Sequence, residues 1–148
     1  MQPLVAPTVA RLSAEMAELG GRVQAAADLS LLMVSRVAPQ NDLSAFVIAE
    51  GLEPLLPDRG TVAHSQIVTR RVGVTLFLRG TGPAGERIVD RAEALVLAVV
   101  AALAGWVPPG AMSDPMAFRG ARLTSAKDGL FAYLIQFSAR DLLRILPT

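Results

Sequence analysis

The stretch ARLTSAKDGLFAYLIQFSAR, residues 121–140, decides the fold of this chain, because it predicts two β-strands joined by a tight turn. The turn is Lys127-Asp128-Gly129, where glycine supplies the backbone freedom that a tight turn needs. In the second strand, large apolar residues alternate at Phe131, Tyr133, Ile135 and Phe137. Alternate residues of a strand share a face, so we expect this row of side chains to lie on a buried face of a sheet.

A long apolar helix is predicted before this hairpin, from about Gly85 to Leu103. Residues at helical spacing form its packed stripe: Ile88, Ala92, Leu95, Val99 and Leu103. Its apolar part, residues 94–107, is shorter than the ~20 residues that a membrane-spanning helix needs, and charged residues precede it. The pattern therefore favours a buried helix and no membrane contact.

The first half of the chain predicts shorter elements. An amphipathic helix is expected over residues 8–19, with Thr8 as its N-cap and Gly20-Gly21 as its stop. A short strand at 22–24, a helix at 25–36, a turn at 39–42 and a strand at 45–48 follow. Residues 50–60 contain two glycines and two prolines besides charged residues, which predicts an exposed loop.

The longest predicted strand lies between residues 61 and 80, a proline-free stretch rich in β-branched residues. Its core face would consist of Val68, Val72, Val74, Leu76 and Leu78. The opposite face is mixed: Ile67, Thr69, Arg71, Gly73, Thr75 and Arg79. Most strands follow one another with no room for a helical crossover, so the sheet should be mainly antiparallel, with helices packed on one face.

Composition sets further bounds. A chain of 148 residues without repeats or linkers predicts a single compact α+β domain over residues 1–148. Cysteine is absent, which excludes disulfides and thiol chemistry, and the net charge of +1 argues against a dedicated nucleic-acid binder. The hydrophobic content of 52% suggests an oligomer. No secretory signal is evident at the N-terminus, so we expect synthesis in the cytoplasm.

The apolar helix, the Gly105-Trp106 pair, the Pro108-Pro109-Gly110 loop and the β-hairpin together resemble the C-terminal half of phage tail terminator (tail completion) proteins. The likeness is clearest over residues 88–137. It implies an α+β virion protein that forms a homohexameric ring on the tail tube protein, in the neck of the particle. Such a ring ends tube growth and offers a surface to the head-tail connector protein, while DNA passes through without sequence recognition.

The residues show no nucleophile, metal cluster or phosphate loop, so we expect no enzyme, no cofactor and no metal. Two alternatives stay open, namely another neck or head-completion ring and a small hydrolase that uses Asp42, Asp58 or His64. His64 is the only histidine, and its neighbour Ser65 would point to the other face of a strand, so they form no dyad. The acids Asp42, Glu50, Glu53 and Asp58 do not have the spacing of a metal site.

The glycines at residues 80–85 precede a helix but lack the Gly-Lys-Ser/Thr of a phosphate loop, so they predict an ordinary turn.

Arg71 and Arg79 fall on one face of the long strand and Arg70 on the other. They are either surface charges or, for Arg71 and Arg79, groups facing DNA in a ring lumen. Trp106 is expected to anchor the core or touch a partner, and residues 138–148 to form a tail on the sheet or on a neighbour.

Overall fold

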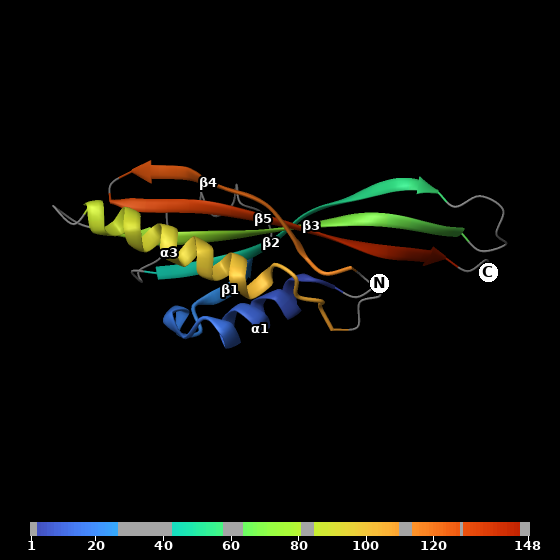
Figure 1. Cartoon of the computed structure of the whole chain (residues 1–148), viewed down its shortest axis with the longest axis horizontal. Coiled ribbons are helices and arrows are strands. Elements are labelled where there is room, and N and C mark those ends of the chain that lie inside the picture. Colours follow the sequence, from blue (N-terminus) through green and yellow to red (C-terminus); the bar gives the residue numbers. More distant parts are fainter. Residues whose placement is uncertain are drawn as a thin grey trace.

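The fold consists of a five-stranded sheet with helices α1 and α3 packed against one of its faces (Figure 1). The computed structural model describes residues 3–26, 43–57, 64–80, 85–109, 114–127 and 129–145. Its elements in chain order are α1 (Val5–Glu15), the 3-10 helix η1 (Ala17–Leu19), β1 (Val23–Ala26), β2 (Leu43–Pro57), β3 (His64–Arg79), α3 (Gly85–Leu103), β4 (Ala117–Lys127) and β5 (Leu130–Ile145).

The strands lie in the order β1-β2-β3-β5-β4. β1 runs parallel to β2, and every other neighbouring pair is antiparallel. The central strands β3 and β5 pair along their full length, from His64 opposite Ile145 to Arg79 opposite Leu130. The α+β class and the mainly antiparallel sheet predicted from the sequence are therefore confirmed.

The core fills the space between the sheet and the helices. From the sheet it takes Val72, Val74, Leu76 and Leu78 of β3, as the alternation predicts, together with Ile135 and Phe137 of β5. From α3 it takes Ala92, Leu95, Val99 and Leu103, which confirms four of the five predicted stripe positions; the side chain of Ile88 lies outside the described residues. No helix among the described residues is both long and apolar enough to cross a membrane.

The predicted hairpin is confirmed as β4 and β5. Gly129 has φ 75°, a left-handed conformation that glycine adopts without strain. Of the alternating residues, Ile135 and Phe137 are buried, while Phe131 and Tyr133 are partly buried against the core. The alternation therefore correctly predicted which face of β5 turns toward the core.

The loop predicted at residues 50–60 is wrong, because β2 continues to Pro57 and pairs with β3. β1 covers only residues 45–48 of β2, and among the described residues no other strand pairs with the outer edge of β2, the kind of edge on which prolines are tolerated. The register shifts at Ala49/Gly51 and at Pro54/Pro57, and these irregularities allow the strand to include its glycine and proline residues. Residues 58–60 lie outside the described part of the chain.

Residues 138–145, expected as a tail on the sheet or on a neighbour, belong to the chain's own sheet, but as an extension of β5 that pairs with β3 and not as a separate tail. The helix predicted at 25–36 does not begin at Ala25, because Ala25 and Ala26 belong to β1. The rest of that helix and the turn at 39–42 lie outside the described residues.

Thr8 is not the N-cap that the sequence suggested. Helix α1 begins at Val5, and the Thr8 hydroxyl donates a 2.7 Å hydrogen bond to the carbonyl oxygen of Leu4. Pro7 lies in the first turn, where the absence of its N–H leaves no helical hydrogen bond unmade. The predicted stop is confirmed, with Gly20 and Gly21 at φ 54° and 80°.

Candidate interaction surfaces

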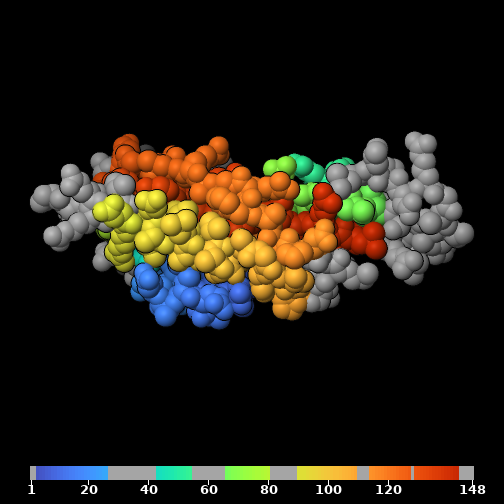
Figure 2. Space-filling view, in the orientation of Figure 1, coloured from blue at the N-terminus to red at the C-terminus, as the bar shows by residue number. Residues whose placement is uncertain are grey.

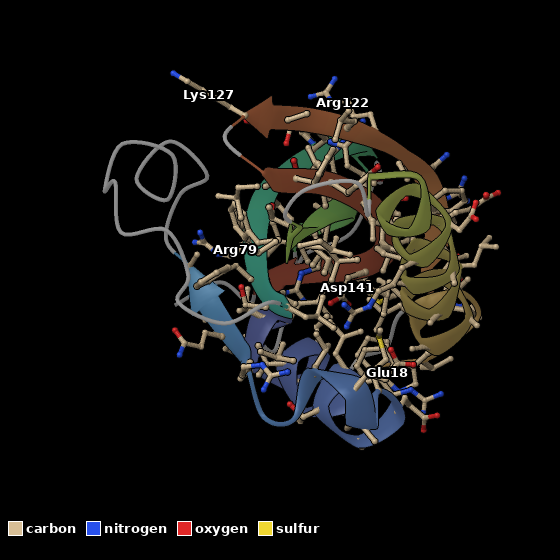
Figure 3. All side chains as sticks on the ribbon, turned by 90° about the vertical axis from the view of Figure 1, so that its left-hand side faces the viewer. Glu18, Arg79, Arg122, Lys127 and Asp141 are labelled. Carbon is tan, nitrogen blue, oxygen red and sulfur yellow. The ribbon has the colours of Figure 1, made fainter. Side chains whose placement is uncertain are left out.

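The two arginines proposed for a ring lumen lie on the face of β3 that turns away from the helices. Alternation and register place Arg71 and Arg79 on the same face, and Figure 3 shows Arg79 on the side of the sheet opposite α3. They are roughly 26 Å apart at a rise of about 3.3 Å per residue, so they form no single anion site. The structure places them on a common face without bringing them together.

Arg71 already has an acidic partner in the chain. Its guanidinium donates a 3.0 Å hydrogen bond to the carboxylate of Glu53 on β2, and both side chains are about half exposed. The bulge at Ala49/Gly51 sets this pairing, because it shifts the register so that Glu53 lies opposite Thr69. An exposed pair of this kind contributes little to stability.

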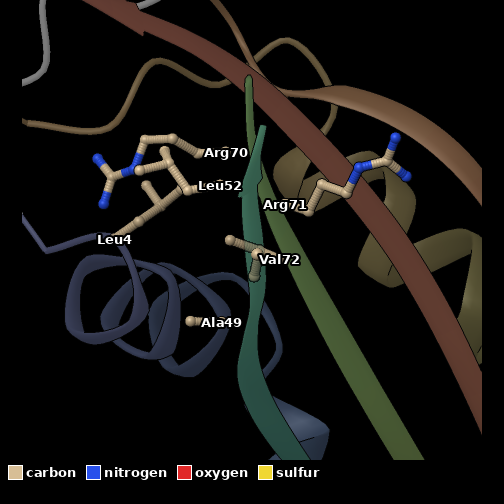
Figure 4. Close-up of a pocket in the computed structure, with 7 residues that line it drawn as sticks. Leu4, Ala49, Leu52, Arg70, Arg71 and Val72 are labelled. Atoms are coloured by element: carbon tan, nitrogen blue, oxygen red, sulfur yellow. The ribbon is translucent and has the colours of Figure 1, made fainter. Parts of the chain in front are cut away.

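Arg70 points to the other side of the sheet, as alternation predicts (Figure 4). Its guanidinium donates a 3.2 Å hydrogen bond to Oδ2 of Asp141, whose side chain is only 3% exposed. The other carboxylate oxygen of Asp141 accepts a 2.8 Å hydrogen bond from the backbone N–H of Leu142. Arg70 thus serves to neutralise a buried carboxylate of the same chain. Figure 4 shows it beside Leu4 and Leu52 in a shallow hollow.

The side chains of the residues named for a hydrolase lie outside the part of the chain that the structure describes. Asp42 and Asp58 lie outside the described residues, and His64 is the first residue of β3, with its side chain outside them as well. Glu50 lies over Gly73, where its carboxylate accepts a hydrogen bond from the amide of Gln136. Among the described residues, no group of three potential metal ligands is present.

Trp106 is packed against the core and is half-buried. The guanidinium of Arg11 lies 5.8 Å from the centre of its ring, and Arg11 Nε donates a 3.0 Å hydrogen bond to the carbonyl oxygen of Ala102 in the last turn of α3. The predicted anchoring role is thus confirmed, and Arg11 joins α1 to the C-terminal end of α3 and to Trp106 just after it through these two contacts. Within α1, Arg11 also forms an ion pair with Glu15.

Two further surfaces combine exposed apolar side chains with charges. The first, which we call the α3–β4 groove, lies between α3 and the edge strand β4 and contains Glu93, Leu97, Arg122 and Leu123. The second, which we call the distal patch, lies near the far end of the sheet and contains Ile67, Asp114, Arg140 and Leu142. The sequence shows these residues but not their proximity, which depends on strand order and register.

The distal patch lies at the end of the sheet where the long strands continue past the helices, on the face that turns away from them. β2, β3 and β5 extend beyond the helices, so this end of the sheet lacks the helical layer (Figure 1). Figure 2 shows the described parts of α1 and α3 covering the other end of the molecule. Ile67 is 47% exposed and lies opposite Leu142 in the antiparallel register.

Comparison with known proteins identifies this architecture. A model of the phage tail terminator protein family matches residues 3–145. The chain belongs to the phage tail terminator family. This membership makes the terminator a structural, non-enzymatic component of a phage-like virion.

A solved structure described as the virion of a native gene transfer agent particle contains a chain similar to this terminator. The two share 18% sequence identity, the match covers 95% of each chain, and the TM-score is 0.57. At this identity the likeness shows a shared fold. No curated protein matches the terminator sequence.

Proposed function

We propose that this terminator forms a six-membered ring on the last ring of tail tube subunits, ends their polymerisation and presents the surface to which the head-tail connector binds. The family match over residues 3–145 is the observation that supports this proposal most directly. The ring would occupy the neck of the particle, with the tail tube protein on one axial side and the connector on the other.

The physical mechanism is capping by surface complementarity. A tube grows while its end offers the same head-to-tail interface to each new ring of subunits. A closed ring satisfies its side contacts internally, and one axial face matches the tube while the other does not reproduce a tube end.

Tail length tests the proposal. Without the gene for this chain, tubes should continue to polymerise beyond their normal length, because their axial end stays open. Electron microscopy of the lysate should show headless tubes of irregular, excessive length. A head-completion ring would instead leave tails of uniform, normal length that fail to join heads, and that result would reject the terminator role.

We also propose that DNA crosses the lumen of the ring by non-specific phosphate contact, with Arg71 and Arg79 on the face toward the DNA. Their common face on β3 supports this assignment. The Glu53 carboxylate reduces the charge that Arg71 offers, so the attraction should be weak and salt-dependent.

A further inference from the structure

We infer that the distal patch of one terminator docks into the α3–β4 groove of the next copy. The partner is therefore a second copy of this chain, bound through two different surfaces. This inference rests on the proposed ring, because a ring of more than two copies needs a head-to-tail contact between unlike surfaces.

Both surfaces expose apolar side chains that could become buried on contact. In the groove, Leu97 of α3 is 60% exposed and Leu123 of β4 is 49% exposed, and Tyr133 lies beside them. In the distal patch, Ile67 and Leu142 form a neighbouring pair across β3 and β5. Apolar side chains that leave the water at the centre of an interface stabilise the complex.

The charges of the two surfaces are complementary. Each surface offers one acid and one arginine for a contact: Glu93 and Arg122 in the groove, Asp114 and Arg140 in the patch. Asp141 also lines the patch, but its carboxylate is bound to Arg70. Within the described part of the chain, none of the other four side chains forms an ion pair or hydrogen bond. Arg140 could therefore meet Glu93, and Asp114 could meet Arg122, at the rim of a docked pair.

A third hollow has no such free charges. It is lined by Leu4, Leu52, Arg70 and Arg71, but Arg70 is bound to Asp141 and Arg71 to Glu53 within the same chain. An approaching copy would have to compete with these pairs. The distal patch and the groove are thus the better matched surfaces.

The positions of the two surfaces also favour a repeating contact. Leu142 lies roughly 30 Å along β5 from Tyr133, at a rise of about 3.3 Å per residue. Tyr133 faces the helices, whereas Ile67 and Leu142 face away from them. The far end of one copy can therefore overlap the helical side of the next copy, and each copy keeps one free surface for a further neighbour.

Disulfide trapping tests this contact directly, because the chain contains no cysteine. Leu97→Cys and Leu142→Cys variants are prepared separately, mixed and oxidised, both as purified protein and in particles that assemble from the two variants together. We expect cross-linked dimers in the mixture and none from either variant alone. Cross-linking of one variant with itself, or rings and particles without cross-links, would overturn the inference.

Charge reversal gives a second readout. Arg140→Glu or Glu93→Arg should lower the assembled fraction about tenfold or more, and their combination should restore it to within about threefold of the parent. Arg91→Glu changes an exposed arginine of α3 outside the groove and should leave assembly unchanged. If the combination assembles as poorly as the single variants, the assignment of this contact is wrong.

The outcomes separate this inference from the proposed function. Normal tail length without the gene would reject the terminator role, whatever the cross-links show. Excessive tail length without the gene, combined with rings that do not cross-link through Leu97 and Leu142, would reject only the contact between the groove and the distal patch.

Discussion

Asp141 is the residue whose surroundings differ most from what its sequence position suggests. The sequence places it in an apolar C-terminal stretch, but its carboxylate is buried on β5 and accepts hydrogen bonds from Arg70 and from the N–H of Leu142. A buried charge that loses its partner remains desolvated and uncompensated. Asp141 and Arg70 should therefore tolerate replacement only as a pair.

We predict that Asp141→Ala lowers the free energy of unfolding by about 3 kcal/mol, because it leaves Arg70 without its carboxylate. Glu53→Ala breaks the exposed ion pair with Arg71 and should cost at most about 1 kcal/mol. Urea unfolding of both variants measures the difference. Equal losses would contradict the structural role assigned to the Arg70–Asp141 pair.

Arg11 supports a second prediction at this scale. Arg11→Ala removes a charged hydrogen bond to Ala102 and the contact with the Trp106 ring, so it should lower stability by about 1–2 kcal/mol. Arg11→Lys retains the positive charge and should lose less. The fluorescence of Trp106, the only tryptophan, reports unfolding in both variants. A loss in the lysine variant as large as in the alanine variant would contradict the importance of the cation.

At the scale of elements, the β4–β5 turn depends on one glycine. Gly129 has positive φ, accepts a 2.7 Å hydrogen bond from the N–H of Gly80, and has no room for a Cβ, which would collide with the carbonyl oxygen of Gly80. Gly129→Ala should therefore destabilise the protein by about 2 kcal/mol or more. Gly51→Ala has open space at the β2 bulge and should stay within about 1 kcal/mol of the parent, as thermal unfolding can show.

The hairpin and α3 could be predicted because their signals are local: alternation in β5, a glycine turn, and a stripe at helical spacing. The second half of β2 could not. Its prolines and glycines indicate a loop locally, whereas pairing with β3 decides its conformation. Residues 138–145 were missed for a similar reason, since only the length of β3 shows that β5 can continue.

Among the interaction surfaces, the sequence predicted the common face of Arg71 and Arg79 from strand alternation alone. It did not predict that Glu53 pairs with Arg71, because that contact depends on the register shift in β2. The groove and the distal patch join residues far apart in the sequence, such as Leu97 with Leu123 and Ile67 with Leu142. Such surfaces follow from strand order, which local patterns do not determine.

At the scale of the whole molecule, the sheet face that turns away from the helices combines Arg71 and Arg79 with acidic Glu50 and Glu53. If this face lines the lumen, Arg71→Glu with Arg79→Glu should reduce DNA delivery roughly tenfold, because phosphates would meet carboxylates. Ring formation should persist, since neither residue belongs to the groove or the distal patch. Glu53→Gln should leave delivery intact, because it frees Arg71 and adds no negative charge.

Particles are counted by electron microscopy, and DNA delivery is measured by infection or gene transfer. Normal delivery by the double variant would remove Arg71 and Arg79 from the lumen, whereas loss of the ring itself would place them at a subunit contact.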